Sequence, residues 1–400
     1  MKPFNGRRVV LGVTGSIAAF KAAALTSELV QLGAEVDVVL TASAARFVTP
    51  LTFHSLTQRR VYTDLFDVLP DESSAHVRLG EQAELLAIVP ATATTLARLA
   101  HGLADDLLGC VALATTAPVL VAPAMESHMW AHPATQANVT TLRERGVHFV
   151  GPVAGRLASG QIGPGRLAPP AEILGRMRAL LGRDGPLAGR RIVVSAGGTQ
   201  EPIDPVRVIT NRSTGKMGYA IAQVARDRGA SVTLVTAPTA LHSPAGVETR
   251  QATTVAEMRE AVLDACVGAD ALVMAAAISD FRPAAVSDRK IKKESGSDGL
   301  VLHLVKNDDF FLEVPKGVLR IAFAAESENL LHNAAEKLAR KGADLIVAND
   351  ITEPGSGFGT DTNRVTLLAP NAAPEALPQL PKEAVAGHIL DRVQALLAGR

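Results

Sequence analysis

The chain has 400 residues, of which 47% are hydrophobic, which is enough for about two to three domains with separate cores. Its 40 basic and 40 acidic residues cancel, which argues against nucleic acid or an anionic membrane surface as the main partner. The cysteines, Cys110 and Cys266, lie far apart and indicate neither a disulfide framework nor a zinc site. We expect a soluble cytoplasmic protein, because the start lacks signal-peptide features and the longest uncharged stretch, 110–125, is too short to span a membrane.

In the first half, strand-like runs alternate with helix-like segments, a pattern that predicts a parallel sheet with helices on both faces. The runs are 8–13, 34–40, 84–89, 119–122 and 147–150. Residues 151–170 are rich in Gly and Pro and are predicted to form a long loop, and residues 182–190 are predicted to form a linker.

The alternation restarts at residue 191 and predicts a second domain of the same class. Its strand-like runs are 192–196, 231–235, 271–276, 320–324 and 344–348, and a helix over 381–397 closes the chain. The sequence therefore predicts two Rossmann-like, doubly wound α/β domains in tandem, covering residues 1–184 and 185–400.

Gly-rich and hydroxyl-bearing turns follow the strands of the first domain. The turn after the first strand contains Gly15 and Ser16 and leads into a helix that starts near Ala18, where backbone amides and the helix N-terminus favour an anion. The second strand ends in Thr41 and Ser43 and not in an acid, which suits a phosphate or ribityl chain better than the ribose of NAD. Further hydroxyls follow the third strand, in Pro90, Ala91 and Thr92. An FMN site is one interpretation, and simple capping of turns and helices is the alternative for each hydroxyl taken singly.

Two side chains of the first domain are candidates for acid–base chemistry. Glu126 comes shortly after the strand-like run 119–122, so it belongs at the crevice where open α/β sheets bind ligands. A surface loop or the first turn of the next helix is an equal alternative for this acid. His76 can act as an acid or base near neutral pH, although a lone histidine is more often structural or exposed.

The second domain has two successive anion-cradling turns, 197–199 and 211–218, which favour a phosphorylated ligand. The latter is not a Walker A loop, because Lys216 is followed by Met217 where that loop has Ser or Thr. Asp280 follows a strand at the crevice edge, and Lys290 begins a basic run that is either a solvated face or a partner for a triphosphate. Lys337 and Lys341 are four residues apart, on one helical face, and extend this positive wall.

Taken in order, these motifs resemble the bifunctional phosphopantothenoylcysteine decarboxylase and phosphopantothenate-cysteine ligase family of coenzyme A biosynthesis. The second half contains DPVRVITNRSTGKMG, AAAISDFRP, KIKK, VKN, ARKGADLIVAND and GFGTDTN. The first half contains GVTGSIAAFKA, PATATTLARLAHGLADDL, PAM followed by HMW, and GRLASGQIGPGR. The resemblance implies a flavodoxin-like flavoprotein domain followed by a ribokinase/Rossmann-like ligase domain.

For the second domain the resemblance implies a ligase that uses CTP and Mg2+ to activate 4'-phosphopantothenate as an acyl-cytidylate, from which the amine of cysteine displaces CMP. Asn211 would steady the acyl-cytidylate, Lys290 would stabilise charge on the transferring phosphoryl group, and Asp280 would hold the metal. Asp308 stands where the family commonly has proline after VKN. The expected nucleotide contacts are Ala276, Ala277, Asp280, Lys290, Asp308, Asp309, Phe310, Phe311, Phe323, Lys337 and Lys341.

For the first domain the resemblance implies a flavin-dependent cysteine decarboxylase. FMN would oxidise the cysteine side chain so that CO2 can leave, and would then return the electrons while a cysteine in the substrate-covering loop supplies a proton. His76 matches the family's active-site histidine, and Ile17 and Met125 fall in motifs that contact FMN. Two positions depart from the family: Glu126 replaces an asparagine, and Ser159 replaces the proton-donating cysteine. An ionised Glu126 would repel the substrate carboxylate unless a raised pKa kept it protonated.

Two hypotheses follow from this resemblance. In the first, the protein carries out both ligation and decarboxylation. In the second, it is a ligase whose first half persists as an FMN-binding assembly module, while decarboxylation is done elsewhere. The second strand ends in the hydroxyl side chains Thr41 and Ser43 and not in an acid, which argues against an NAD-dependent oxidoreductase. The resemblance also implies homo-oligomers, with trimeric first domains, dimeric ligase domains and a dodecamer as an arrangement that combines them.

Overall fold

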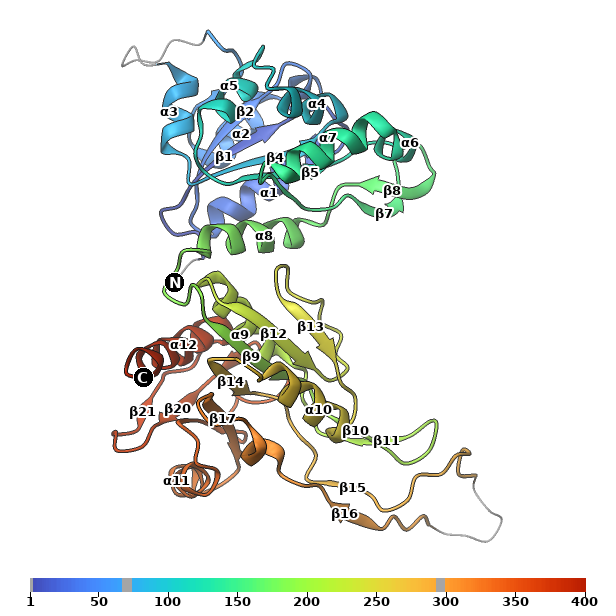
Figure 1. The fold of residues 1–400 in the computed structure, drawn as a ribbon, viewed down its shortest axis with the longest axis vertical. Helices are drawn as coiled ribbons and strands as arrows, with labels where there is room; N and C mark the ends of the chain where they lie inside the picture. Colours follow the sequence, from blue (N-terminus) through green and yellow to red (C-terminus); the bar gives the residue numbers. More distant parts are fainter. Residues whose placement is uncertain (1–2, 67–73, 293–298) are drawn as a thin grey trace. The chain divides into compact units, whose positions relative to one another are not determined.

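The computed structural model describes residues 3–66, 74–292 and 299–400. The chain divides into two compact units, Met1–Leu181 and Gly182–Arg400, and the sequence predicts a boundary after residue 184 (Figure 1). Each unit is built on a central, mostly parallel sheet with helices on both faces. The prediction of two doubly wound α/β domains is therefore confirmed. None of the described helices is both long enough and apolar enough to cross a bilayer.

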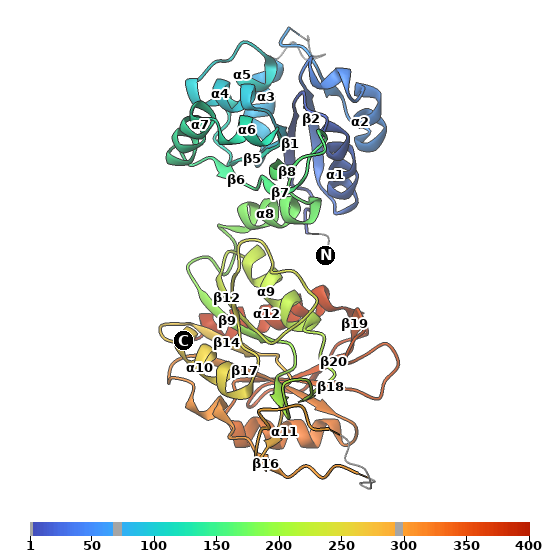
Figure 2. The same cartoon turned by 90° about the vertical axis from the view of Figure 1, so that its right-hand side faces the viewer.

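The first unit contains a six-stranded parallel sheet with the order β3-β2-β1-β4-β5-β6. Figure 2 labels four of its strands, β1, β2, β5 and β6. Because the chain order reverses between β1 and β4, the crevice at the carboxyl ends of these two strands is the position where such sheets bind ligands. The strands are β1 Arg8–Val13, β2 Glu35–Leu40, β3 Val61–Tyr62, β4 Leu85–Ala91, β5 Val119–Pro123 and β6 His148–Phe149.

Helices bury both faces of this sheet. One core cluster packs α1 and α8 against the sheet, and the other packs α3, α4, α5 and α7 against the opposite face. The helices are α1 Ala19–Gln31, α2 Pro50–Thr57, α3 Ala75–Gln82, α4 Ala93–His101, α5 Leu107–Ala114, α6 Ser127–Ala131, α7 Pro133–Glu144 and α8 Pro170–Gly182, with a 3-10 turn, η1, at Ala44–Arg46.

A hairpin replaces the long loop expected over residues 151–170. Strands β7 (Val153–Arg156) and β8 (Ile162–Arg166) pair antiparallel, so that expectation was wrong. The exposed glycine-rich strands lack the alternation of buried and polar side chains that marks a strand in sequence. Gly165 explains part of this composition, because a Cβ atom there would lie 2.2 Å from the carbonyl oxygen of Met125.

The second unit contains an eight-stranded sheet with the order β13-β12-β9-β14-β17-β18-β20-β21. The strands from β13 to β18 are parallel as predicted, and β20 and β21 extend the edge in antiparallel pairing. The order reverses between β9 and β14, which places a second ligand crevice there. The strands are β9 Arg191–Ala196, β12 Ser231–Thr236, β13 Glu248–Gln251, β14 Ala271–Met274, β17 Leu319–Glu326, β18 Leu345–Asp350, β20 Val365–Leu368 and β21 Glu375–Ala376.

Helices α9 and α12 pack on one face of this sheet, and α10 and α11 on the other. Three short antiparallel ribbons, β10–β11, β15–β16 and β19–β22, complete the unit. The helices are α9 Lys216–Asp227, α10 Val255–Ala265, α11 Leu330–Lys341 and α12 Lys382–Ala398, with a 3-10 turn, η2, at Phe310–Glu313. The ribbon strands are β10 Gln200–Pro202, β11 Val208–Thr210, β15 Phe281–Pro283, β16 Leu304–Lys306, β19 Thr362–Asn363 and β22 Leu380–Pro381.

Candidate active sites

A cavity of about 860 Å³ opens in the second unit beside the carboxyl ends of β14, β17 and β18. It brings together residues that the sequence places far apart, from the turn before α9 to the helix α11. The predicted residues that line it are Asn211, Ala276, Ala277, Asp280, Asp308, Asp309, Phe310, Phe311, Phe323, Lys337 and Lys341. Lys290 is the one predicted residue of this domain that does not line the cavity.

Side-chain hydrogen bonds fix the turns at the switch point of this sheet. The buried Ser195 Oγ, on β9, accepts a hydrogen bond from the backbone N–H of Ala276 at 3.1 Å. Asn211 Nδ2 donates to the carbonyl oxygens of Ala277 at 3.3 Å and Ile278 at 3.2 Å. The segment before α9 and the segment after β14 are therefore held together, so Asn211 sits where both predicted anion-binding turns meet.

One wall of the cavity carries three cations from α11, namely Lys337, Arg340 and Lys341. Lys341 Nζ forms a 3.0 Å ion pair with Asp309 and lies 5.4 Å from the centre of the Phe311 ring. Burial is the largest factor that lowers the pKa of Lys337, and the neighbouring charge of Lys341 lowers it further. A desolvated, crowded ammonium of this kind favours an anionic ligand.

Lys290 lies outside this wall, exposed on the segment that follows β15. The neighbouring residue is nevertheless anchored, because Ile291 donates its N–H to Asp204 Oδ2 at 3.2 Å and its carbonyl oxygen accepts from Arg207 Nη2 at 3.2 Å. Asp204 is buried and also accepts hydrogen bonds at 2.8 Å from the N–H groups of Val206 and Arg207. The turn after β10 thus fixes where the Lys290 segment leaves the domain.

The first unit places its predicted cofactor residues at the ends of β1, β2 and β4. A Cβ atom at Gly15 would lie 2.4 Å from the Cβ of Ser43, so the turns after β1 and β2 touch at a point where only glycine fits. Thr14 bridges the switch point: its Oγ1 donates to the carbonyl oxygen of Pro90 at 2.6 Å and accepts from the N–H of Thr92 at 3.1 Å. Thr14 is not among the residues predicted from the sequence, although a hydroxyl directly after the first strand could have indicated its place at the site.

Several predicted hydroxyls also make local capping hydrogen bonds. Thr41 Oγ1 accepts from the N–H of Ala44 at 3.2 Å, Thr92 Oγ1 caps α4 by accepting from Thr95, and Ser16 Oγ accepts from Ala18 at 3.3 Å. Capping uses acceptor capacity of each hydroxyl and leaves its proton available. Beside them, Ala91 is buried within β4 and Ile17 is 57% exposed at the start of α1.

Glu126 is the N-cap residue of α6. Its carboxylate accepts from the N–H groups of His128 at 2.7 Å and Met129 at 3.3 Å, and lies 3.0 Å from His128 Nδ1. Desolvation is the largest single influence and raises the pKa, but these hydrogen bonds outweigh it and the pKa of Glu126 is lowered overall. The raised pKa that would keep this group protonated is therefore contradicted, and Glu126 is ionised at neutral pH.

The β7–β8 hairpin lies against the residues around Glu126. Met125 donates its N–H to the carbonyl oxygen of Gly165 at 3.0 Å, and a Cβ atom at Gly163 would come within 2.5 Å of Ser127 Oγ. Ser159 is exposed in the turn between β7 and β8. The strand β8 of this hairpin therefore packs against the segment that contains Met125 and Ser127, and Ser159 lies in the turn that precedes it.

His76 is half-buried in the first turn of α3. Its Nδ1 atom is buried, and no described residue provides it with a hydrogen-bond partner. A buried ring nitrogen without a partner is costly, so it is suited to a ligand.

Two family models cover nearly the whole chain. The model described as Flavoprotein matches residues 2–182, and the model described as the DNA/pantothenate metabolism flavoprotein C-terminal domain matches residues 187–397. The chain is 44% identical over 398 residues to the coenzyme A biosynthesis bifunctional protein CoaBC of Bacillus subtilis, and the match covers 98% of each chain. The chain belongs to the CoaBC family.

A second CoaBC relative, from Mycobacterium tuberculosis, is 44% identical over 412 residues, with 98% of this chain and 97% of the relative covered. Among solved structures, the C-terminal domain of a CoaBC protein is 38% identical, covers 54% of this chain and 100% of its own, and has a TM-score of 0.47. Against the CoaBC resemblance drawn from the motifs, Glu126 and Ser159 are the departures in the first unit.

Neither cysteine replaces the missing thiol in the described structure. Both are free, and the Sγ of Cys110 donates to the carbonyl oxygen of Ala104 at 3.3 Å. Cys266 is buried in the second unit, where burial raises its pKa to about 12. No group of three or more His, Cys, Asp or Glu residues in the described ranges is arranged to hold a metal ion. A metal at Asp280 would therefore need oxygen ligands from bound phosphates and water, as Mg2+ commonly uses.

Proposed function

We propose that the protein catalyses two steps of coenzyme A biosynthesis. The second unit joins 4'-phosphopantothenate to cysteine at the expense of CTP, and the first unit, with FMN, decarboxylates the product to 4'-phosphopantetheine. The observation that supports this most strongly is that eleven separately predicted ligase residues line one cavity of the second unit. The family membership of the whole chain supports the pairing of the two activities.

In the ligase step, the α11 cations and the turns at the switch point bind CTP. Asp280 holds Mg2+ together with phosphate oxygens, and Asn211, fixed by its hydrogen bonds to Ala277 and Ile278, steadies the acyl-cytidylate. Lys290 stabilises charge on the transferring phosphoryl group when its segment reaches the ligand. The amine of cysteine then displaces CMP.

The residues of the first unit fit FMN. The turns after β1 and β2 approach closely at Gly15 and Ser43, where backbone N–H groups at the start of α1 favour a phosphate, and the buried Nδ1 of His76 has no hydrogen-bond partner among the described residues. FMN, when bound, supplies reversible oxidation of the cysteine side chain. The hairpin that carries Ser159 shields the site from water, and the hydroxyl of Ser159 is the proton source at that position, although it is a far weaker acid than a thiol.

A ligase with an inactive first unit is the second candidate. It is favoured by the ionised carboxylate of Glu126, which faces a substrate carboxylate with like charge, and by the absence of a thiol at Ser159. In this case the first unit binds FMN and serves assembly. Exposed apolar side chains on α1 and α2, such as Phe20 at 59% and Leu51 at 69%, support association of first units with one another.

One experiment separates the two candidates. The purified protein is supplied with 4'-phosphopantothenate, cysteine, CTP and Mg2+, and CMP, CO2 and the final thiol, 4'-phosphopantetheine, are followed by mass spectrometry. The bifunctional proposal expects all three products, whereas CMP without CO2 supports the ligase alone. Lys290→Ala should abolish CMP release, and unchanged release would show that the ligase assignment is wrong. Sedimentation measurements on the same protein test the proposed trimeric, dimeric and dodecameric arrangements.

A further inference from the structure

The turn of residues 197–199, between β9 and β10, packs against two segments that carry residues of the second unit's cavity. The turn itself does not line the cavity. A Cβ atom at Gly198 would lie 2.8 Å from the carbonyl oxygen of Asn211, so only glycine allows this approach. Thr210 Oγ1, one residue earlier, donates to the carbonyl oxygen of Thr199 at 2.9 Å. One side of the turn is thereby fixed to the segment that contains Asn211.

The other side of the turn holds the segment that leads from β14 to Asp280. The N–H of Thr199 donates to the carbonyl oxygen of Ala277 at 3.3 Å, and Thr199 Oγ1 accepts from the N–H of Ser279 at 3.0 Å. Thr199 is 0% exposed, and Ser279 is 4% exposed. Thr199 therefore has no surface that a ligand could reach, and any effect it has on the cavity must pass through the backbone that it holds.

Asn307, directly after β16, supports the same backbone. Its Nδ2 donates to the carbonyl oxygen of Ser279 at 2.9 Å, and its N–H donates to the carbonyl oxygen of Asp280 at 2.8 Å. Its Oδ1 accepts from Arg282 Nη1 at 2.7 Å, which fixes the orientation of the amide. Asn307 is 8% exposed. The N–H and the carbonyl group of Ser279 are thus both bound by buried side chains.

The carboxylate of Asp280 is available to a ligand although its backbone is fixed. Asp280 is exposed and lines the cavity, and within residues 3–66, 74–292 and 299–400 its carboxylate forms no hydrogen bond or ion pair. A group that binds an ion must be held by its supporting residues to within about 0.5 Å. Loss of one support should therefore displace the carboxylate while the rest of the cavity keeps its shape.

We propose that Thr199 is a positioning residue of the ligase, whose buried hydroxyl holds the backbone at Ser279 so that the Asp280 carboxylate meets the divalent cation of a metal–nucleotide complex. Asn307 is the second support. This role rests on the proposed function in one respect, because that function assigns Mg2+ to Asp280. Removing the Thr199 hydroxyl should then weaken the binding of metal-bound CTP selectively.

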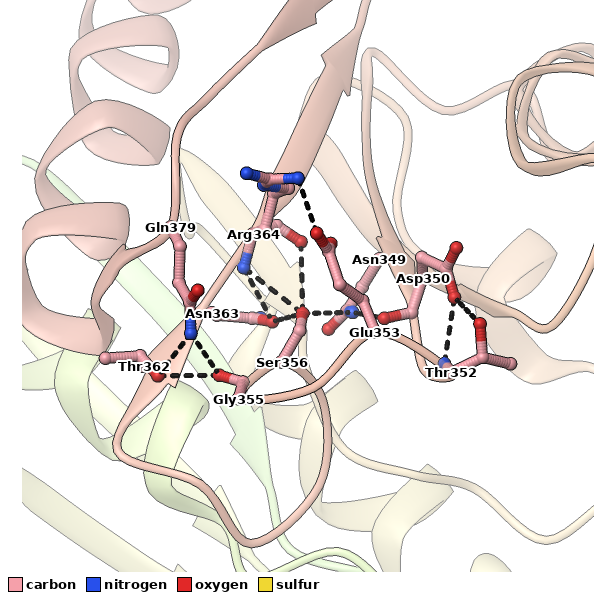
Figure 3. Close-up of polar contacts among 10 residues, drawn as sticks. All are labelled: Asn349, Asp350, Thr352, Glu353, Gly355, Ser356, Thr362, Asn363, Arg364 and Gln379. Carbon is pink, nitrogen blue, oxygen red and sulfur yellow. Dashed lines mark hydrogen bonds and ion pairs between the residues drawn. The ribbon is translucent and has the colours of Figure 1, made fainter.

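A second buried network at the same cavity provides a control. Ser356 Oγ donates to Asn363 Oδ1 at 2.8 Å and accepts from Asn349 Nδ2 at 3.1 Å (Figure 3). The N–H of Gly357 donates to the same Asn363 oxygen at 3.1 Å, and Lys382, which also lines the cavity, donates to the Gly357 carbonyl oxygen at 3.1 Å. Within the described part of the chain, none of these residues is hydrogen-bonded to the turn after β14. Ser356→Ala should therefore loosen this wall without displacing the carboxylate.

The test measures the affinity of the full chain for CTP by calorimetry, in excess Mg2+ and in EDTA, without the acyl substrate. Thr199→Val preserves the shape of the side chain but leaves the buried N–H of Ser279 without its partner. It should weaken binding in excess Mg2+ about tenfold and leave the affinity in EDTA unchanged. Thr199→Ser keeps the hydroxyl and should bind as the original does. Asn307→Ala should show the same selective loss, which keeps the test decisive if Thr199→Val does not fold.

The ratio of the two dissociation constants separates positioning from general loosening of the cavity. Ser356→Ala should leave this ratio unchanged. Equal losses with and without Mg2+ in Thr199→Val, no loss in excess Mg2+, or the same change of the ratio in Ser356→Ala would overturn the role of Thr199.

Asp280→Asn tests the proposed function separately. If this variant keeps the full gain in affinity from Mg2+, Asp280 does not hold the cation and the proposed metal role is refuted. If Asp280→Asn loses the gain while Thr199→Val and Asn307→Ala keep it, the metal role stands and only the positioning role is refuted.

Discussion

The two units use the same crevice of a doubly wound sheet but differ in what reaches it. In the second unit, predicted side chains from distant segments line one cavity. Cations such as Lys337 lie in this cavity together with the acid Asp280. In the first unit the scaffold positions are in place, with Gly15 against Ser43, while Glu126 occupies a position where the resembling family has a neutral amide. The described contacts of the first unit thus concern the shape of its crevice, whereas those of the second unit bring together the side chains expected to bind a ligand.

At Glu126, the role of the side chain in local structure can be distinguished from the effect of its charge. An N-cap needs an acceptor oxygen, and both asparagine and glutamate carry one, so α6 keeps its start when the side chain gains a charge. The start of α6 can therefore be kept whether this side chain is an amide or a charged carboxylate. Substitutions at residues that shape a site and at residues expected to react there should therefore have different effects, which are largest at Gly15 and smallest at Glu126.

Gly15→Leu should abolish flavin binding and leave the ligase intact. The new side chain would start 2.4 Å from the Cβ of Ser43, so the turn must open and the phosphate cradle is lost. The visible flavin absorption after reconstitution with FMN measures the loss. CMP release by the second unit should stay within about twofold of the original, because the sites lie in separate units. A flavin spectrum that survives this change would place the cofactor elsewhere.

Ser159→Cys should raise the yield of the reduced thiol product, 4'-phosphopantetheine, by about a hundredfold, the lower range for a positioned proton donor. A thiol titrates near pH 8.5, far below a hydroxyl, so it can protonate the intermediate. Mass spectrometry of the product distinguishes this thiol from the oxidised ene-thiol. Ser159→Ala is the matched control and should not rescue the reaction. If Ser159→Cys changes nothing even in combination with Glu126→Asn, the first unit is an assembly module.

Lys337→Met should raise the KM for CTP about tenfold or more and leave the KM for cysteine unchanged. Methionine preserves the length and packing of the side chain but removes a partly desolvated charge from the cavity wall. Steady-state kinetics of CMP release provide both constants. Glu336→Gln alters the neighbouring residue, whose side chain is 69% exposed, and should have no effect. A rise in the KM for cysteine would indicate that α11 faces the other substrate.

The sequence predicted the sheets well because buried parallel strands are continuous apolar runs; β1 and β12 begin where expected. It missed the β7–β8 hairpin, whose exposed glycine-rich strands have no hydrophobic period. Of the ligase residues, only Lys290 lies away from the cavity, because its segment is held through the backbone of Ile291. The sequence did not predict Lys382 as a site residue, because a lysine at the start of a helix is expected to be exposed to solvent. The burial of Lys382 depends on a loop that is distant in the sequence.

Glu126→Ala should lower the thermal stability of the first unit slightly, by about 2–4 °C at pH 7, because α6 loses its N-cap. The pKa of Glu126 is lowered by folding, so its contribution is fully present above the ordinary value of 4.5 and is lost as the pH falls through the folded-state pKa. Melting curves of the two proteins should therefore converge once the pH falls below the folded-state pKa of Glu126, which lies below 4.5. Glu126→Asn retains a capping oxygen and should match the original at pH 7 but show no such convergence. A difference in melting temperature that persists at low pH would show that Glu126 acts through packing and not through its charge.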